Sequence, residues 1–149
     1  MFSKAHLHSH CLAVVHQRIS NLEAEIRKVQ ASANSETKSS AGDKYETGRA
    51  MAQLEIERGQ VQLTEAIRLR AILQQVEKIK ISDGVAKGAL VTTSQNNFYI
   101  AISLGTLELD GKKFFLISPE SPIGKLLLGM RVGDSITWNS EVQVIVAIE

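Results

Sequence analysis

The sequence has little cysteine and no long hydrophobic run, and each absence excludes something. Its one cysteine, Cys11, cannot form a disulfide within the chain, which agrees with a reducing compartment. No apolar run approaches the roughly 18 residues that a membrane-spanning helix requires. The N-terminus, where Lys4 is followed by scattered histidines, also lacks the apolar core of a signal peptide. We therefore expect a soluble, cytoplasmic protein that does not bind membranes.

The chain also lacks a strong net charge. Its 149 residues carry a net charge of +1, which excludes a polybasic nucleic-acid binder. Residues 1–80 hold 12 Lys and Arg against 9 Asp and Glu, whereas residues 81–149 hold 5 against 7. Neither balance favours binding dominated by phosphate groups. We expect a protein or a protein–nucleic acid complex as partner.

Motifs for independent catalysis are absent as well. No spacing of Ser, His and Asp indicates a nucleophilic triad, and no glycine-rich phosphate loop is present. Histidines and the cysteine alternate near the N-terminus, and His6 and His10 would share a face if a helix begins that early. Such alternation at a chain end is more often incidental, so we expect no native metal site among these residues: His6, His8, His10, Cys11 and His16.

The first half of the chain carries apolar residues at helical spacing, in two segments separated by a polar link. In the first segment a three-four alternation marks a coiled-coil seam made of Leu12, Val15, Ile19, Leu22, Ile26 and Val29. In the second, from about residue 47 to 80, one face carries Ala52, Ile56, Leu63, Ala66, Leu73 and Val76, widened by Leu54, Val61, Ile67 and Leu69.

Neither segment contains proline, and each has about 30 residues, which corresponds to a helix of about 45 Å. A lone helix of that length has no core of its own, and a short polar link favours folding back. We therefore predict an antiparallel coiled-coil hairpin as a domain of residues 1–80, with an acidic tip at residues 39–48. The alternative is a pair of helices in an ordinary bundle.

The second half changes its pattern to short β-branched and aromatic runs separated by Gly, Asn, Asp and Ser. We predict strands at residues 89–93, 98–102, 113–117, 135–138 and 142–146, with Phe98, Phe114, Phe115 and Trp138 packed in the core. Asp110-Gly111 is a hairpin-turn signal, and Ser140-Glu141 is expected to join the last two strands.

A short helix is predicted after residue 120. Ser121 can cap it, Pro122 fits its first position, and Gly129 can end it. Its apolar residues Ile123, Leu126 and Leu127 are expected to pack on the sheet. The fold class is therefore α+β, with a helical hairpin followed by a small antiparallel sheet domain at residues 81–149.

The polar link, SSAGDKYETGR at residues 39–49, carries two carboxylates three residues apart. Asp43 followed by Glu46 has the spacing of a capping box, in which both acids also favour a helix N-terminus. Alternatively, two acids at the end of a long projection can enter a pocket of another macromolecule, where oxygen ligands suit Mg²⁺. The two roles are compatible, because a cap would fix the directions of both side chains.

These residues carry a family resemblance. The run Gly42-Asp43-Lys44-Tyr45-Glu46 resembles the hairpin tip of the Gre transcript-cleavage factors of bacterial RNA polymerase, which read Gly-Asp-x-x-Glu-Asn. Residues 117–129, ISPESPIGKLLLG, are similar to the family's Ile-Ser-x-x-Ser-Pro-Ile-Ala-x-x-Leu-x-Gly segment, and Gly133-Asp134 matches the Gly-Asp before its penultimate strand. The order of these parts agrees over nearly the whole chain.

The resemblance implies a fold and a function. The C-terminal domain would be FKBP-like and would dock on the rim of the polymerase's secondary channel, while the hairpin enters that channel. Asp43 and Glu46 would help to hold a second Mg²⁺ and orient the water that cleaves backtracked RNA, so the polymerase remains the enzyme. No cofactor would bind stably to the factor alone. Nascent RNA and DNA would be met through the polymerase complex, and Ser121, Pro122, Ile123 and Gly124 are assigned to partner binding.

The sequence departs from the family pattern beside these acids. Thr47 stands where the family has Asn, Arg49 replaces an acid, and Ala50 replaces Tyr. Arg49 could pair with Glu46 or with an RNA phosphate. A regulator that occupies the channel without cleaving RNA is the nearest alternative, and a coiled-coil adaptor with an unrelated partner is another. An independent hydrolase is the least favoured, because an exposed tip offers no pocket.

Overall fold

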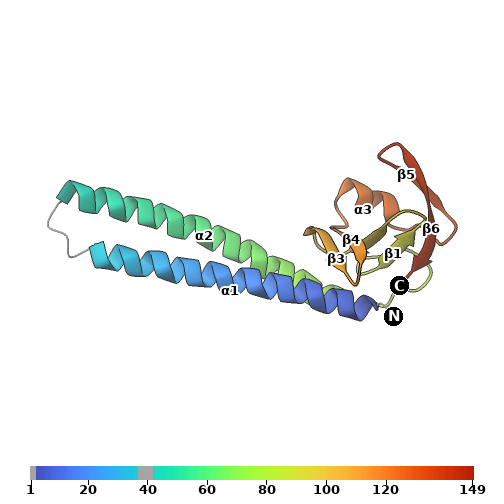
Figure 1. The fold of residues 1–149 in the computed structure, drawn as a ribbon, viewed down its shortest axis with the longest axis horizontal. Coiled ribbons are helices and arrows are strands. Elements are labelled where there is room, and N and C mark those ends of the chain that lie inside the picture. Colours follow the sequence, from blue (N-terminus) through green and yellow to red (C-terminus); the bar gives the residue numbers. More distant parts are fainter. Residues whose placement is uncertain (1–2, 37–41) are drawn as a thin grey trace. The chain divides into compact units, whose positions relative to one another are not determined.

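The computed structural model describes residues 3–36 and 42–149, with the side chains of residues 35, 36 and 42–45 outside the description (Figure 1). The contacts divide the chain into two compact units. One unit combines Met1–Cys11 with Ala71–Glu149, and the other is Leu12–Arg70. The predicted domain boundary at residue 80 stays a prediction.

Two long helices form the hairpin. Helix α1 spans Lys4–Glu36 and α2 spans Gly42–Val76, and the two lie side by side along their length (Figure 1). The predicted hairpin of packed helices is confirmed. Both helices begin earlier than the apolar pattern indicated, and the added part of α1 includes the buried residues Leu7 and Cys11.

The seam of the hairpin follows the predicted stripe for most of its length. Val15 and Ile19 of α1 and Ala66, Leu69, Leu73 and Val76 of α2 are buried. Three residues that were expected to widen the stripe of α2 are exposed instead: Leu54, Val61 and Ile67. A two-helix hairpin can cover only one narrow face of each helix, so apolar residues outside that face remain in contact with water.

A glycine of α2 lies against a side chain of α1 in the seam. A Cβ added at Gly59 of α2 would lie 2.9 Å from Cγ1 of Ile26 on α1. Glycine within a helix is unfavourable by about 1 kcal/mol relative to alanine. The Ile26 side chain fills the space that this glycine leaves, which explains its place in the seam.

The C-terminal part is a six-stranded sheet with strand order β3-β4-β2-β1-β6-β5. The strands are β1 (Leu90–Thr93), β2 (Asn97–Ile100), β3 (Gly105–Leu109), β4 (Lys112–Ile117), β5 (Ser135–Trp138) and β6 (Glu141–Ile148). All neighbouring pairs are antiparallel except β2 and β4, which are parallel. The α+β class is confirmed, while the expectation of a purely antiparallel sheet is corrected by this one pair.

Strand β3 was not predicted. It lies at one edge of the sheet, and its five residues are all exposed or half-buried. An edge strand with so little burial carries no strong apolar alternation, so its sequence resembles a loop. The Asp110-Gly111 signal nevertheless located the turn correctly, since Asp110 has φ 52° and Gly111 has φ 77° between β3 and β4.

The last hairpin turns one residue earlier than expected. Asn139 and Ser140 have φ of 53° and 64°, and Trp138 pairs with Glu141 across the turn. Two successive residues in the left-handed region are the geometry of a two-residue hairpin loop. Glu141, which was predicted to belong to the turn, is therefore the first residue of β6.

Both faces of the sheet bury side chains. One face holds the main core, with Val91, Phe98, Ile100, Leu127 and Ile145 among its members. The predicted aromatic packing is confirmed there. The ring centroid of Phe98 lies 5.5 Å from that of Phe115 and 5.4 Å from that of Trp138. Aromatic pairs at such separations add to the stabilisation from buried area.

A second set of buried side chains lies outside that core. It consists of Leu90, Tyr99 and Leu116, which are cross-strand neighbours on β1, β2 and β4. Tyr99 contacts His8 in the second turn of α1, and a Cβ at Gly88 would lie 2.9 Å from the carbonyl oxygen of Val76 at the end of α2. The helix ends that belong to the sheet-containing unit thus meet residues of β2 and of the segment before β1.

The short helix α3 spans Pro122–Leu127, as predicted. Ser121 is its N-cap, and the backbone N–H of Gly124 donates to the Ser121 hydroxyl. Ile123 and Leu127 are buried, but Leu126 is 37% exposed, which corrects the expectation that all three pack on the sheet. One turn and a half of helix presents only one narrow stripe to the core.

Candidate functional site

The two predicted acids lie at the start of α2. Because α2 begins at Gly42, Asp43 is in the first helical turn, while its side chain lies outside the described residues. Glu46 is described, and its side chain is exposed to solvent. The predicted tip at residues 39–48 includes residues 39–41, which also lie outside the description. The capping box between Asp43 and Glu46 stays a prediction.

The four residues that follow Glu46 are not buried. Thr47, Arg49 and Ala50 are exposed, and Gly48 is half-buried. Arg49 lines a groove of about 440 Å³ between the helices, together with Gln30, Asn34, Gln53 and other residues of both helices. The groove is lined mainly by amide side chains, so it offers hydrogen-bonding groups near Glu46. Pairing of Arg49 with Glu46 or with RNA stays a prediction.

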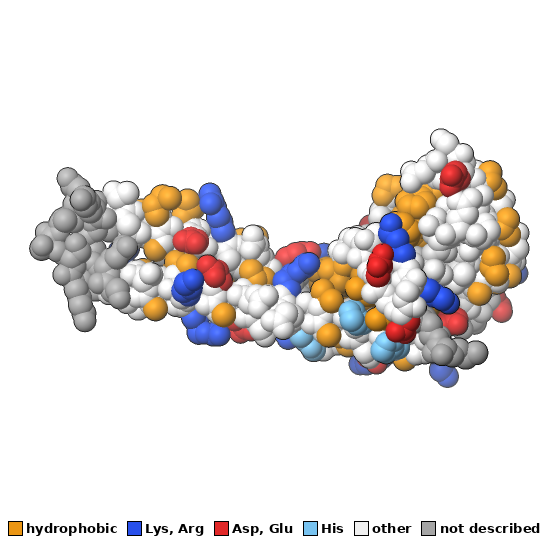
Figure 2. Space-filling view, in the orientation of Figure 1, with side chains coloured by type: hydrophobic (Ala, Val, Ile, Leu, Met, Phe, Trp, Pro, Cys, Tyr) orange, Lys and Arg blue, Asp and Glu red, His pale blue; other side chains and the backbone are white. Residues whose placement is uncertain are grey.

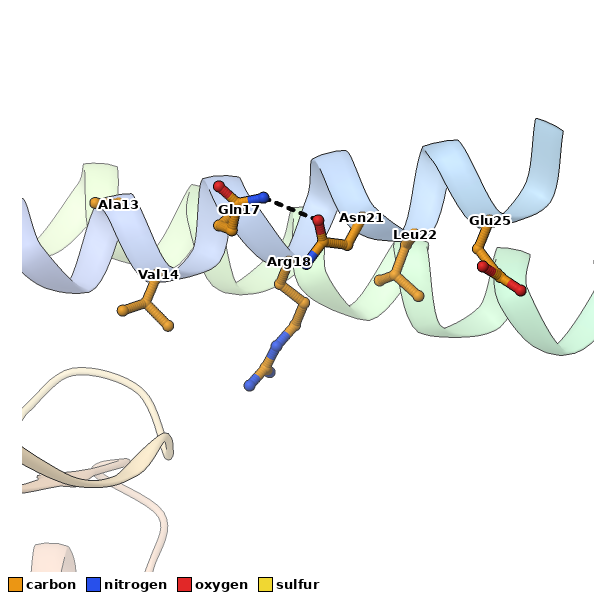
Figure 3. A pocket seen from close by; sticks show the side chains of 7 residues that line it. All are labelled: Ala13, Val14, Gln17, Arg18, Asn21, Leu22 and Glu25. Atoms are coloured by element: carbon orange, nitrogen blue, oxygen red, sulfur yellow. Dashed lines mark hydrogen bonds between the residues drawn. The ribbon is translucent and has the colours of Figure 1, made fainter. Parts of the chain in front are cut away.

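A second groove follows one side of α1 (Figure 3). It has a volume of about 700 Å³, and apolar Val14 and Leu22 alternate in it with charged Arg18 and Glu25. The Gln17 side-chain amide donates a 2.8 Å hydrogen bond to Asn21 within it. All lining residues come from one helix, so this is a stretch of open helix surface and lacks the convergent walls of a catalytic pocket.

A buried polar pair lies in the sheet-containing unit. Nδ1 of His8 and the hydroxyl of Tyr99 share a 2.6 Å hydrogen bond. Nε2 of His8 is buried without a hydrogen-bond partner, and the nearest carboxylate oxygen of Glu77 is 3.7 Å away, too long for a hydrogen bond. A cavity of about 120 Å³ adjoins these groups and is also lined by Lys4 and Gly88. The cavity is large enough for ordered water, and the polar side chains of His8 and Tyr99 line it beside apolar groups.

Burial controls the titration of this pair. It lowers the pKa of His8, a shift that Glu77 opposes and Lys4 reinforces. It also raises the pKa of Tyr99 above its usual range and that of Cys11 to about 11. Desolvation disfavours the charged form of each group. His8 is therefore neutral at physiological pH and serves as an anchor between α1 and β2.

The N-terminal histidines do not converge. His8 and Cys11 are buried, whereas His6, His10 and His16 are exposed. Among the residues that the structure describes, no cluster of three or more His, Cys, Asp or Glu side chains could hold a metal ion. Within the same residues, no helix combines the length and apolar character needed to cross a membrane.

The segment assigned to partner binding is largely occupied by structural contacts. The Ser121 hydroxyl donates to the carbonyl oxygen of Ser118 and accepts from Gly124, and both Ile123 and Gly124 are buried. Pro122 is the member of the predicted set that is exposed. The assignment stays a prediction, and in this structure Pro122 is its available contact surface.

The sequence of the sheet domain has a known relative. Residues 84–149 match the family model of the C-terminal domain of the transcription elongation factors GreA and GreB. The sheet domain is thus of the GreA/GreB C-terminal type. The match covers β1 to β6 and α3 and does not include the hairpin. No match to an individual curated protein was found.

Sequence reasoning found the acids and the α3 segment but missed the pair of His8 and Tyr99. The two residues are 91 positions apart, and neither belongs to a motif. The one available signal was His8 next to Leu7 on a helix, where an apolar neighbour predicts burial on one side. That signal does not identify the hydrogen-bond partner.

Proposed function

We propose that this Gre-type elongation factor binds bacterial RNA polymerase in its secondary channel and stimulates cleavage of backtracked RNA. The observation that carries the proposal is the presence, in one chain, of a GreA/GreB C-terminal domain and a helical hairpin with Asp43 and Glu46 at the start of α2. The polymerase performs the reaction, and the hairpin supplies ligands. Nascent RNA and DNA are met within the polymerase complex in the cytoplasm.

The chemistry favours a factor that lends carboxylates. Phosphodiester hydrolysis benefits from two divalent ions, one beside the attacking oxygen and one beside the leaving oxygen. Mg²⁺ takes six oxygen ligands in nearly ideal octahedral geometry and is commonly held by one or two carboxylates together with phosphate and water. If this chain supplies two carboxylates, most coordination positions of the Mg²⁺ ion are left to the polymerase, the RNA and water. The site is therefore complete only in the complex.

The local structure supports this role for Glu46 in particular. Its side chain is exposed in the second turn of α2, so another macromolecule can reach the carboxylate without unfolding the helix. Positions 43 and 46 belong to one helix, and positions three residues apart in a helix share a face. Both acids also lie near the helix N-terminus, where the helix dipole favours negative charge.

A transcript-cleavage assay tests the proposal. A cognate polymerase is stalled in a backtracked state with 3′-labelled RNA and Mg²⁺, and short 3′ products are measured with and without the protein. We expect products with wild type, and a rate lower by about tenfold or more for Glu46→Ala, as for other groups that stabilise developing charge. Glu55→Ala changes another exposed acid of α2 and serves as control. Absence of products with wild type would refute cleavage.

A second candidate function keeps the binding and omits cleavage. It is favoured by Arg49, which is exposed one turn after Glu46 and adds a cation beside the proposed metal ligands. This alternative predicts that wild type alters initiation or pausing, yields no cleavage products, and binds polymerase equally well after Glu46→Ala. A coiled-coil adaptor with another partner predicts no polymerase binding at all.

A further inference from the structure

The first turns of α1 carry one buried histidine. Histidine side chains lie on the surface of the N-terminal half of α1 (Figure 2), whereas only 4% of the His8 surface is exposed. His8 and the two residues nearest to its ring nitrogens, Tyr99 and Glu77, all belong to the unit that contains the sheet. An imidazole has two polar nitrogens, and each of them needs a partner when the ring is buried.

The two ring nitrogens of His8 have different surroundings. Nδ1 shares a 2.6 Å hydrogen bond with the Tyr99 hydroxyl, whereas Nε2 has no hydrogen-bond partner among the residues that the structure describes. A tyrosine hydroxyl can donate and accept, so the bond to Tyr99 can form whether or not Nδ1 carries a proton. Nε2 can therefore change its protonation and its partner while Nδ1 keeps the ring attached to β2.

A carboxylate lies just beyond hydrogen-bonding distance of Nε2. Oε2 of Glu77 is 3.7 Å from this nitrogen, and the Glu77 side chain is 64% exposed, so its position is only loosely fixed. His8, Glu77 and Tyr99 line the same cavity of about 120 Å³, which gives the Glu77 side chain room to move. A shift of about 0.5–1 Å would bring Oε2 to hydrogen-bonding distance of Nε2.

The charges around His8 come from four parts of the chain. The titratable groups are Lys4 and Cys11 on α1, Glu77 after α2, Tyr99 on β2 and Glu149 after β6. Lys4 disfavours a second positive charge on His8, although Glu149 offsets part of the Lys4 charge. The thiol and the phenol are neutral at physiological pH, because burial raises the pKa of both groups. Among these groups, Glu77 is the anion that favours a charged His8.

We propose that His8, Tyr99 and Glu77 form a pH-responsive clasp at the start of α1. When Nε2 takes up a proton, it donates a charge-assisted hydrogen bond to the Glu77 carboxylate, while Nδ1 donates to the Tyr99 hydroxyl. The ring is then held from both sides, by β2 and by the residue that follows α2. Burial still disfavours the charged ring, so the clasp reduces destabilisation by acid and does not reverse it.

An NMR titration of the full-length protein tests the clasp. The pKa of His8 is read from its imidazole chemical shifts, which are identified by their loss in His8→Gln. Glu77→Gln keeps the size of the side chain and removes its charge, so the folded-state pKa of His8 should fall by about 0.5 or more. Glu55→Gln makes the same change at an exposed acid of α2, and it should leave the pKa of His8 as in wild type.

Stability in acid gives a second measurement. Between about pH 7 and pH 5, the urea midpoint of Glu77→Gln should decline more steeply than that of wild type, because its charged His8 lacks the ion pair. Glu55→Gln should follow the wild-type profile. An unchanged or raised pKa of His8 in Glu77→Gln would overturn the inference, and so would urea profiles of Glu77→Gln and wild type that run parallel. Neither measurement involves RNA polymerase, so the clasp and the proposed function fail independently.

Discussion

In the sheet-containing unit, Phe98, Ile100 and Leu127 have no exposed surface at all, whereas the hairpin becomes steadily less buried toward its turn. Across residues 20–34 and 46–65, every described side chain is exposed or half-buried. The last buried pair of the seam is Ile19 on α1 and Ala66 on α2. The sheet unit thus has a fully buried hydrophobic core, whereas the described outer part of the hairpin packs only half-buried side chains along the seam.

This difference relates burial to function. Local opening requires little free energy where few apolar contacts are buried, and sites that must adapt to a partner are found at that end of the stability range. Glu46 lies in this part of the hairpin, beyond the last buried residues. The sheet, in contrast, holds a fixed surface. Glu46 therefore lies where the helices open most easily, whereas the sheet keeps a fixed shape.

The largest expected effect is on the sheet core. Phe98→Ala removes a ring with 0% exposure that packs on Phe115 and Trp138, and we expect a loss of about 3–5 kcal/mol in unfolding free energy. Ile26→Ala, at a half-buried position of the hairpin, should lose only about 1 kcal/mol. Urea unfolding followed by circular dichroism measures both. Equal losses would remove the contrast between the two regions.

Hydrogen exchange sharpens the same contrast. Backbone amides of residues 22–34 and 50–63 should exchange faster than those of residues 12–19 and 66–70, with opening free energies lower by about 1–2 kcal/mol. The reason is that none of the described side chains between Ile19 and Ala66 is buried. Mass spectrometry of peptides after brief labelling gives the comparison. Uniform protection along both helices would show that the hairpin opens as one unit.

The anchor between α1 and the sheet should respond to pH. Burial lowers the folded-state pKa of His8 below the value of about 6.5 found in unfolded chains. The unfolded chain therefore binds the proton more readily than the folded chain. Neutral His8 contributes its full stabilisation of the fold above about pH 6.5, and this contribution declines as the pH falls through the folded-state pKa.

His8→Gln tests this effect, because glutamine can hydrogen-bond to Tyr99 and does not titrate. Urea midpoints measured between about pH 5 and 8 should decline less on acidification than those of wild type. The exposed His10→Gln is the matched control and should leave the wild-type profile unchanged. If His8→Gln and wild type show parallel profiles, His8 does not titrate in this range in the way described.

The smallest effect is expected for the surface ion pair of α2. Arg68 donates two hydrogen bonds to the carboxylate of Glu65, which lowers the pKa of that acid. Both side chains are more than half exposed. Exposed ion pairs contribute little to the free energy of unfolding, because water and salt screen the two charges. Arg68→Ala should leave the urea midpoint unchanged within error at physiological salt, and a clear decrease would reveal a tighter contact in the hairpin than burial indicates.

Periodicity and turn chemistry predicted most of the fold. The seam residues Val15, Ile19 and Leu73, the Asp110-Gly111 turn and the Ser121 cap are all determined by local physics. Three features were missed because they depend on distant parts of the chain. These are the edge strand β3, the parallel pairing of β2 with β4, and the hydrogen bond between His8 and Tyr99.

The candidate site was predictable only in part. The spacing of Asp43 and Glu46 was visible in the sequence, and the exposure of Glu46 agrees with the expected role. The same motif logic assigned Ile123 and Gly124 to a partner, although their burial shows that they also serve the core. The exposure of Val142, Val144 and Val146 could not be predicted, because the two faces of a strand are distinguished only by what packs against them.

The central claim is that the acids of α2 hold Mg²⁺ for the polymerase, and a Mg²⁺ titration of transcript cleavage tests it most directly. Cleavage rates are measured across Mg²⁺ concentrations with wild type, Asp43→Asn, Glu46→Gln and the control Glu55→Gln, each at saturating protein. The account predicts that Asp43→Asn and Glu46→Gln need several-fold more Mg²⁺ for half-maximal rate, while Glu55→Gln matches wild type. An unchanged Mg²⁺ requirement in both acid variants would contradict the claim.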